Sequence, residues 1–207
     1  MLAIAGGKGG VGKTTTTLGL STALDAPVVV ADADPDMPDL HALAGVDREP
    51  TLADLDAAGV DAVAQPHPAE PAVSLLPAPP IDEADAVDRS LRRLAAADRP
   101  SVVDCPGGAG PDAAAPLRVA DTAVLVTTLC APALRDAAKT AAIARTLGTP
   151  VRGVVLTRTR AAPDAVAELL GCPILVSVPP TDPPILGDDA VRAAYDRLGH
   201  TLGEDIT

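Results

Sequence analysis

Three kinds of side chain are absent from this chain of 207 residues, and others are scarce. It has no Phe, Trp or Asn, one Tyr, one Gln and only three lysines. A GC-rich genome explains part of this bias, because its codons favour Ala, Gly, Pro and Arg. Codon use alone does not explain 28 acidic residues against 16 basic ones. The acid excess and scarce lysine also indicate adaptation to a high-salt, halophilic cytoplasm, where screening relieves the repulsion between negative charges.

The net charge of −12 excludes strong nucleic-acid binding by bulk charge. Weak basic clusters occur at Arg89–Arg93 and Arg158–Arg160, and they are typical of solvated helix faces or loop ends. No apolar run approaches the ~20 residues that a membrane span needs. A contact with DNA or an anionic membrane would therefore need a local basic patch.

Cysteine is scarce as well. Cys105, Cys130 and Cys172 are far apart, and none belongs to a C-x-x-C pair. An odd number of cysteines, with a strand expected at the N-terminus in place of a leader, favours a reducing, cytoplasmic location. The length suits one domain with a full core, so we expect a single domain over residues 1–207.

A glycine-rich loop is the most informative feature present. Residues 7–14 read G-K-G-G-V-G-K-T, which matches the phosphate-loop pattern G-x-x-x-x-G-K-[ST]. An apolar run, Leu2–Ala5, precedes it as a strand, and Thr14–Leu24 follows as a helix. Backbone N–H groups and the helix dipole then converge on one point, which predicts a site for a triphosphate. The residues expected at this nucleotide are Gly7, Lys8, Gly9, Gly10, Val11, Gly12, Lys13, Thr14 and Thr15.

Lysine is concentrated in that loop. Two of the three lysines, Lys8 and Lys13, lie within six positions of each other, and the third is Lys139. A compact ammonium on a flexible stem suits close approach to phosphate better than the planar guanidinium of arginine. Both loop lysines are therefore predicted to act on the triphosphate.

Short aliphatic runs alternate with alanine-rich stretches along the whole chain. This alternation predicts an α/β fold of the P-loop NTPase type, a mainly parallel sheet flanked by helices on both faces. The expected strands are 2–5, 28–32, 73–76, 101–104, 123–127, 151–156 and 174–178. The expected helices are 13–24, 82–97, 112–118, 133–147, 163–170 and 188–202. Residues 66–80 are rich in proline, and we expect an irregular crossing there that contains one short strand.

Acidic residues follow two of the expected strands. Asp32 and Asp34 come after 28–31, and Asp104 comes after 101–103. Ligands bind at the carboxyl ends of strands in open α/β sheets, so these acids should share an edge with the phosphate loop. Asp104 and Asp32 are candidates for a Mg²⁺ shell together with the Thr14 hydroxyl, and Asp34 is a candidate for orienting an attacking water.

Together these motifs resemble the deviant Walker A ATPases of the MinD/ParA family. The resemblance runs from the loop through Asp32–Pro35, Val103–Gly108 and Val124–Thr128 to Gly153–Arg158 and Pro179. The resemblance covers nearly the whole chain. It is stronger to archaeal MinD-like proteins than to plasmid ParA, and the acidity points to haloarchaeal ones.

The resemblance implies ATP and Mg²⁺ as ligands and a slow, partner-regulated hydrolysis to ADP and phosphate. ATP would close a homodimer in which Lys8 of each subunit reaches the other subunit's phosphates, with Lys13 and Asp34 completing the catalytic set. The segments after Asp34 and Asp104 would switch with the γ-phosphate and signal to a protein activator or cargo in division, partitioning or positioning. Thr157, Arg158 and Pro179 would lie at the base, and family members usually carry Asn at the position of Thr157.

The chain departs from MinD at its end. The expected last helix has no basic flank, so no direct membrane anchor is expected. Three alternatives remain open: an ATP-dependent biosynthetic enzyme of the cobyrinate amidase or dethiobiotin synthetase type, a metal-cluster carrier, and a module that binds ATP without hydrolysing it. The first would need an added substrate pocket, and the second a paired cysteine near Cys172.

Overall fold

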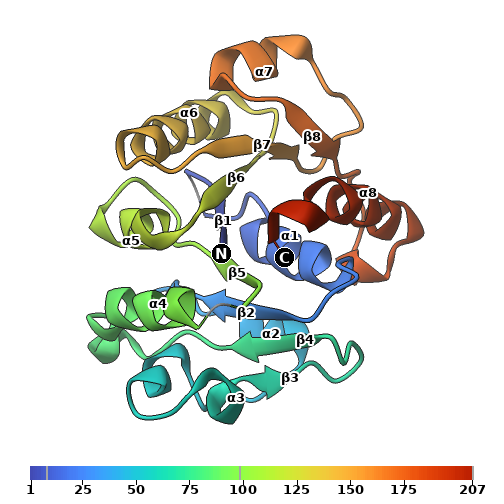
Figure 1. Ribbon diagram of the computed structural model, residues 1–207. Helices are drawn as coiled ribbons and strands as arrows, with labels where there is room; N and C mark the ends of the chain where they lie inside the picture. Colours follow the sequence, from blue (N-terminus) through green and yellow to red (C-terminus); the bar gives the residue numbers. More distant parts are fainter. Residues whose placement is uncertain (8, 98, 207) are drawn as a thin grey trace.

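The protein is a layered α/β structure in this computed structural model, which describes residues 1–7, 9–97 and 99–206 (Figure 1). Within them a single sheet has the strand order β3-β4-β2-β5-β1-β6-β7-β8. The strands are β1 (Leu2–Ala5), β2 (Val28–Asp32), β3 (Gln65–Pro66), β4 (Val73–Leu76), β5 (Ser101–Asp104), β6 (Thr122–Thr127), β7 (Val151–Leu156) and β8 (Ile174–Ser177). Every pair is parallel except β3 with β4, and the predicted mainly parallel sheet is confirmed.

Helices cover both faces of the sheet. They are α1 (Lys13–Thr22), α2 (Leu40–Ala44), α3 (Val60–Val63), α4 (Ala86–Ala96), α5 (Pro111–Val119), α6 (Ala131–Thr146), α7 (Asp164–Leu170) and α8 (Asp189–Ile206). Short 3-10 helices span Leu52–Asp56, Ile81–Glu83 and Ile185–Gly187. In Figure 1, α4, α5 and α6 lie on one side of the strands and α1 and α8 on the other.

The core is aliphatic, as the shortage of aromatic residues requires. Helix α4 shows why a helix forms at its place, because Val87, Leu91 and Leu94 recur at helical spacing and pack on the sheet. The single aromatic residue, Tyr195, is the exception on the other face. Its ring fills the space beside Gly19, where an added Cβ would come within 2.4 Å of a ring carbon. This close contact seats α8 on α1, directly behind the phosphate loop.

Four sequence expectations need correction. The proline-rich segment begins in a strand, because Gln65–Pro66 pairs antiparallel with β4 at the sheet edge, where a residue without an N–H is tolerated. Helices α2 and α3 were not expected, since each has only one or two buried apolar side chains. The expected helix 82–97 is divided into a 3-10 turn and α4. The last helix extends to Ile206 because Leu202 and Ile206 are buried.

Candidate functional site

The loop between β1 and α1 has the backbone of a phosphate cradle. Gly10 and Gly12 adopt left-handed conformations, with φ of +76° and +95°, which glycine adopts without steric penalty. Gly12 is the N-cap of α1, so the free N–H groups of the first helical turn face the loop. A Cβ added at Gly9 or Gly10 would have no described heavy atom within 4 Å, so this side of the loop is open. Lys8 lies outside the described residues.

Packing against β6 and α6 fixes the start of the loop. A Cβ at Gly7 would come within 2.2 Å of the Asp136 carbonyl carbon, and a Cβ at Gly6 within 2.6 Å of the Val126 carbonyl oxygen. Both obstacles are backbone atoms, which do not move aside. Only glycine fits at these two positions, and the loop is therefore held against a helix that starts more than a hundred residues further on.

The β7–α7 connection holds the other side of the loop. The Thr157 hydroxyl donates to the Val11 carbonyl at 2.7 Å, and its oxygen also lies 3.3 Å from the Thr127 carbonyl. The Arg158 guanidinium donates to the Gly10 carbonyl at 2.6 Å. Arg158 has a φ of +56°, a strained value for a residue with a side chain, which commonly marks a functional segment.

Asp104 lies buried beneath the start of α1. Its carboxylate accepts a hydrogen bond from the Thr17 hydroxyl at 3.2 Å and another from the Thr14 hydroxyl. Burial raises the pKa of Asp104 to about 6, although the two hydroxyls and the Lys13 ammonium oppose the rise. The structure thus brings Thr14, Lys13 and Asp104 together as the sequence predicted. A carboxyl with a raised pKa is stabilised in its charged form by a nearby cation, which suits a Mg²⁺ site.

Asp32 is the cross-strand neighbour of Asp104, since β2 and β5 pair these two residues. Its Oδ1 accepts from the Asp34 N–H at 3.0 Å and its Oδ2 from the Leu40 N–H at 3.3 Å. Burial, and then the Asp104 charge, raise the pKa of Asp32. Because both oxygens accept hydrogen bonds from backbone N–H groups, Asp32 stabilises the conformation of the segment that carries Asp34.

The Asp34 side chain is half-buried. Its Oδ1 accepts from the Met37 N–H at 3.1 Å, which stabilises the turn after β2. Asp34 lines a cavity of about 630 Å³ in front of the loop, so a solvent molecule or ligand in that cavity can reach its carboxylate. Two other segments close this cavity, the loop after β5 at Pro106–Gly108 and the start of α5 at Asp112.

A second cavity of about 140 Å³ lies on the other side of the loop. Its lining includes Thr157, Arg158 and Pro179, which the family resemblance places at the nucleotide base. It also includes Ile185 and Tyr195, which were not expected there. The cavity shares Gly12, Thr15 and Arg158 with the larger one, so the two are continuous around the loop. Apolar positions at helical spacing in 188–202 could have indicated that Tyr195 is buried, but no local signal indicated Ile185.

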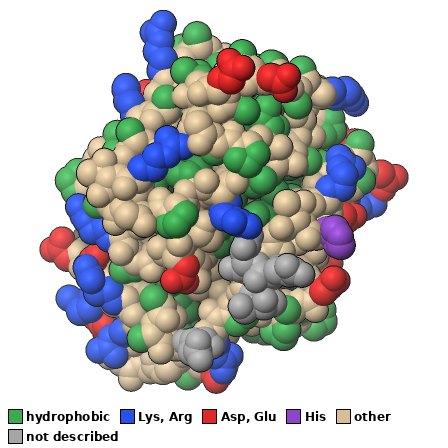
Figure 2. Space-filling model, turned by 45° about the horizontal axis from the view of Figure 1, so that its top comes forward, with side chains coloured by type: hydrophobic (Ala, Val, Ile, Leu, Met, Phe, Trp, Pro, Cys, Tyr) green, Lys and Arg blue, Asp and Glu red, His purple; other side chains and the backbone are tan. Residues whose placement is uncertain are grey.

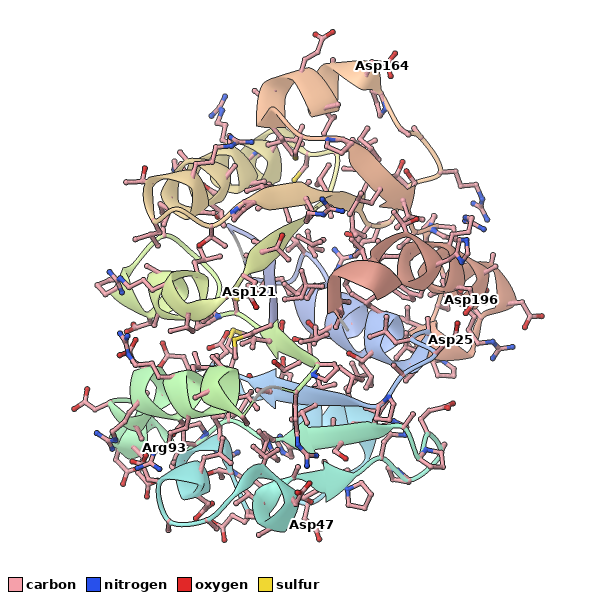
Figure 3. The ribbon with its side chains drawn as sticks, in the orientation of Figure 1. Asp25, Asp47, Arg93, Asp121, Asp164 and Asp196 are labelled. Atoms are coloured by element: carbon pink, nitrogen blue, oxygen red, sulfur yellow. The ribbon has the colours of Figure 1, made fainter. Side chains whose placement is uncertain are left out.

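Charged side chains elsewhere are dispersed. On the face in Figure 2, basic and acidic groups are interspersed and do not form one basic patch. The acids labelled in Figure 3, among them Asp47, Asp164 and Asp196, come from separate elements and are exposed. Within residues 1–7, 9–97 and 99–206, no three His, Cys, Asp or Glu side chains form a metal site by themselves. None of the helices in that part is long and apolar enough to cross a membrane.

This sheet order, with a glycine-rich loop between β1 and α1, defines a P-loop nucleotide-binding fold. The chain belongs to the family described as the CobQ/CobB/MinD/ParA nucleotide binding domain, which matches residues 2–183. The resemblance to the MinD/ParA group is therefore confirmed. An uncharacterized ATP-binding protein of Methanocaldococcus jannaschii is 30% identical over 197 residues, which cover 88% of this chain and 74% of the relative.

Solved structures agree with this assignment. The septum site-determining protein MinD of Pyrococcus horikoshii, complexed with Mg-ADP, has a TM-score of 0.84 at 25% identity and covers 97% of this chain and 94% of its own. The cell division ATPase MinD of Pyrococcus furiosus has a TM-score of 0.83 at 26% identity, with 98% of both chains covered. Cobyrinic acid a,c-diamide synthase of Mycobacterium smegmatis shares the fold at 21% identity, with a TM-score of 0.74 and 97% and 93% covered.

Proposed function

We propose that this protein is a regulatory ATPase whose single domain, residues 1–207, binds Mg-ATP and switches state on hydrolysis. The observation that carries the proposal is the cradle formed by Gly10, Gly12 and the first turn of α1, with Lys13 beside it and Asp104 below. Phosphate oxygens would accept hydrogen bonds from the free N–H groups, and Lys13 would contact the β- and γ-phosphates.

The donor set also fits Mg²⁺. This ion keeps several waters and usually takes only one or two protein oxygens plus phosphate oxygens. The Thr14 hydroxyl is one such oxygen, and Asp104, hydrogen-bonded to it, would orient that hydroxyl and hold a bound water. Asp32 would support this shell from behind through its contact with the Asp34 segment. When bound, the ion would neutralise charge on the phosphates.

Asp34 is the proposed water-orienting group for hydrolysis. It faces the cavity from a short turn and lies near enough to Asp104 to raise that residue's pKa. Its segment is tied to the buried Asp32, so movement after loss of the γ-phosphate would pass directly to Pro35–Asp39. The loop at Pro106–Gly108 would form the second switch segment.

The rim of the large cavity supports an ATP-bound homodimer. Met37 and Leu43 line it and expose 57% and 44% of their surface, which is unusual for large apolar side chains in a chain this acidic. A second subunit across the cavity would cover them and bring its Lys8 to the phosphates. We also propose that the protein works in a salt-rich cytoplasm with a protein activator or cargo, and that α8 is not the part that contacts a membrane. The apolar residues of α8, including Val191, Leu198 and Leu202, are buried against the core.

Light scattering and phosphate release in molar KCl with Mg²⁺ test this proposal. We expect the mass to double with ATP but not with ADP, and a slow release of phosphate. Asp34→Ala should still bind ATP and dimerise while hydrolysis falls by about 100-fold or more, since its carboxylate would act on the attacking water. Lys8→Ala should bind ATP yet remain monomeric. A wild-type monomer under every condition would contradict the dimer, and wild-type turnover by Asp34→Ala would contradict the role of Asp34.

A further inference from the structure

The Thr17 hydroxyl on α1 has an unusual hydrogen-bond partner for a helical residue. A hydroxyl inside a helix commonly donates to a backbone carbonyl of its own helix. In this chain the acceptor lies three or four positions earlier for Ser21, Thr22, Thr140, Thr146 and Thr201. Thr17 is fully buried, and its hydroxyl donates instead to Asp104 Oδ1 at the end of β5, at 3.2 Å. Its single hydroxyl hydrogen therefore serves the carboxylate beneath the phosphate loop.

Thr14 and Thr17 bond the same carboxylate from one face of α1. They are three positions apart, and residues at that spacing are neighbours on a helix surface. The Thr14 hydroxyl also hydrogen-bonds the Asp104 carboxylate. A hydroxyl has one hydrogen and two lone pairs, so a Thr14 side chain that donates to Asp104 keeps both lone pairs for a cation. The orientation of the Asp104 carboxylate thus decides whether Thr14 is ready to bind an ion.

The backbone of Asp104 does not set this orientation by itself. Strand β5 pairs with β1 and β2, and the Asp104 carbonyl accepts from the Ala33 N–H at 3.0 Å, so the main chain is fixed. The terminal torsion of an Asp side chain is nevertheless broad, and the carboxylate can rotate about it. The hydrogen bond from Thr17 to Oδ1 supplies the missing restraint.

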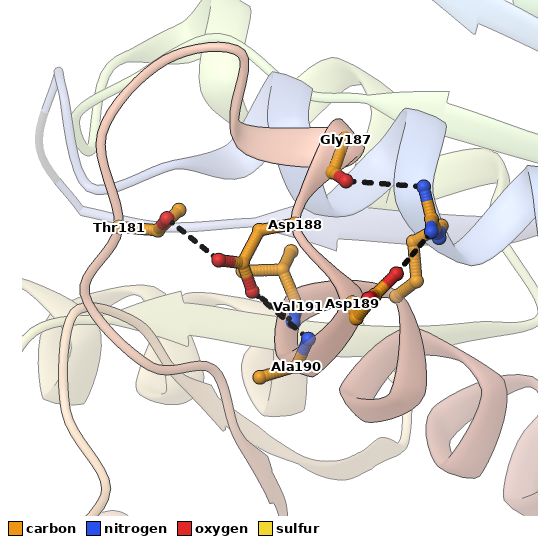
Figure 4. Close-up of polar contacts among 7 residues, drawn as sticks. Thr181, Gly187, Asp188, Asp189, Ala190 and Val191 are labelled. Carbon is orange, nitrogen blue, oxygen red and sulfur yellow. Dashed lines mark hydrogen bonds and ion pairs between the residues drawn. The ribbon is translucent and has the colours of Figure 1, made fainter.

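Helix α1 is held from its other side, as such a restraint requires. The Thr16 hydroxyl, one position before Thr17, shares a hydrogen bond of 3.3 Å with the Tyr195 hydroxyl of α8. The start of α8 is fixed in turn by Asp188, which accepts two backbone N–H groups of the first turn and the Thr181 hydroxyl (Figure 4). Adjacent threonines therefore connect α1 to α8 in one direction and to β5 in the other.

We infer that Thr17 is a positioning residue for Mg²⁺, because by orienting the Asp104 carboxylate it keeps the lone pairs of the Thr14 hydroxyl available to the ion. Thr17 acts through Asp104 and is not itself a ligand. The inference rests on the proposed function and deepens it, since it assumes the Mg-nucleotide site. The nucleotide itself is held by loop N–H groups and Lys13, so Thr17 should affect the ion and leave metal-free nucleotide binding unchanged.

Titration of Mg²⁺ into protein saturated with a fluorescent ADP analogue, in molar KCl, tests this inference without turnover. Thr17→Val removes the hydroxyl at nearly constant volume. We expect the half-saturating Mg²⁺ concentration to rise about tenfold or more, as is usual when a group that orients a metal ligand is lost. Affinity for the analogue in EDTA should stay close to that of wild type. Thr17→Ser keeps the hydroxyl and should restore the Mg²⁺ response.

Thr122→Val is the matched control. Thr122 is also buried, and its hydroxyl donates to the Pro150 carbonyl at 3.1 Å where β6 begins, at the edge of the sheet opposite the phosphate loop. The substitution removes a buried hydroxyl in the same way, so it should lower stability without changing the Mg²⁺ response. An equal loss of Mg²⁺ affinity in both variants would overturn the inference, because the effect would then be one of general stability.

An Asp104→Asn background shows whether Thr17 acts through Asp104. There, Thr17→Val should change the Mg²⁺ response little further, because residues in one hydrogen-bond network are not additive. Additive losses would overturn the inference, and so would an unchanged Mg²⁺ response in Thr17→Val or an equal weakening of the analogue with and without Mg²⁺. If wild type binds no analogue under either condition, the proposed function itself fails, which is a distinguishable result. If Thr17→Val does not fold, as judged by circular dichroism, Thr17→Ala takes its place in the same comparisons.

Discussion

The two cavities beside the phosphate loop differ in what their walls offer a ligand. The larger cavity has backbone N–H groups, the Lys13 ammonium, and acidic side chains on the segments that follow β2 and β5. The smaller one has apolar side chains and hydroxyls that already bond the protein. One loop serves both, because Gly12 and Arg158 border each of them. The large cavity therefore has the groups for chemistry, whereas the small one has mainly a shape.

The rigidity of the two sides differs as well. Thr157, Thr181 and Asp188 tie the small cavity to the phosphate loop and to α8 by side-chain hydrogen bonds. The large cavity is bounded by turns that depend on a few bonds each, such as the two that Asp32 accepts. A switch needs segments of low local stability. The turns on the phosphate side, which depend on few bonds, suit that role.

The largest expected effect is on the phosphate side. Lys13→Ala removes a charge-assisted contact to the nucleotide, so we expect binding of ATP to weaken by about 100-fold, or ~3 kcal/mol. Lys139→Ala is the matched control, because Lys139 is exposed and forms an ion pair with Asp136 at 3.1 Å, away from the loop's open side. Titration with fluorescent ATP measures both. Equal, small losses in the two variants would mean that Lys13 does not contact phosphate.

The next effect tests how the loop is seated. Gly7→Ala would drive a Cβ into the Asp136 backbone, and we expect unfolding to become easier by about 2 kcal/mol, or roughly 4–8 °C in melting temperature. Gly9→Ala places its Cβ in open space and should leave the melting temperature within about 1 °C. Thermal scans followed by circular dichroism compare the two. A similar change in both variants would mean that α6 does not fix the loop.

A smaller effect concerns pH. Because burial raises the pKa of Asp104 from 3.8 to about 6, the folded protein binds more protons than the unfolded chain between these values. The contribution of Asp104 to stability is therefore greatest below pH 3.8 and is lost as the pH rises through 6. Asp104→Asn stays neutral, so without Mg²⁺ it should be more stable than wild type above pH 6, by about 1–2 kcal/mol.

Urea denaturation at pH 4.5 and pH 7.5 measures this difference. The advantage of Asp104→Asn should shrink at the lower pH, while the stabilisation by Mg-ATP at pH 7.5 should be smaller than in wild type. An advantage that is independent of pH would mean that the Asp104 carboxyl titrates normally in the fold.

Sequence reasoning was sufficient where the determinant is local. Strands β1, β2, β4, β5 and β7 have the predicted bounds, because each is a short, mainly apolar run between turn residues. The acids at strand ends were predicted because parallel strands bring their carboxyl ends to one edge. The short strand β3 was missed, since two residues ending in proline show no strand pattern.

Contacts between distant residues were not predictable. Thr157 and Val11 are 146 positions apart, and nothing at either position indicates that one bonds the other. The contact between Gly7 and α6 is of the same kind, because it depends on where the sheet places a helix. The family resemblance implied that Thr157 lies near the base, which stays a prediction, while its bond to the loop follows only from the tertiary structure.

The smallest expected effect lies on the boundary between the cavities. Arg158→Ala loses the bond to the Gly10 carbonyl but keeps the strained backbone at φ +56°, so ATP and GTP binding should each weaken about threefold. Arg158→Gly loses the same bond and relieves the strain, and should be more stable than Arg158→Ala by about 1 kcal/mol. Arg160→Ala is the control, since Arg160 is exposed two positions away. Titration and melting curves separate these contributions. A loss confined to ATP in Arg158→Ala would mean that Arg158 reads the adenine edge, and the two sides of the loop would then both recognise the nucleotide chemically.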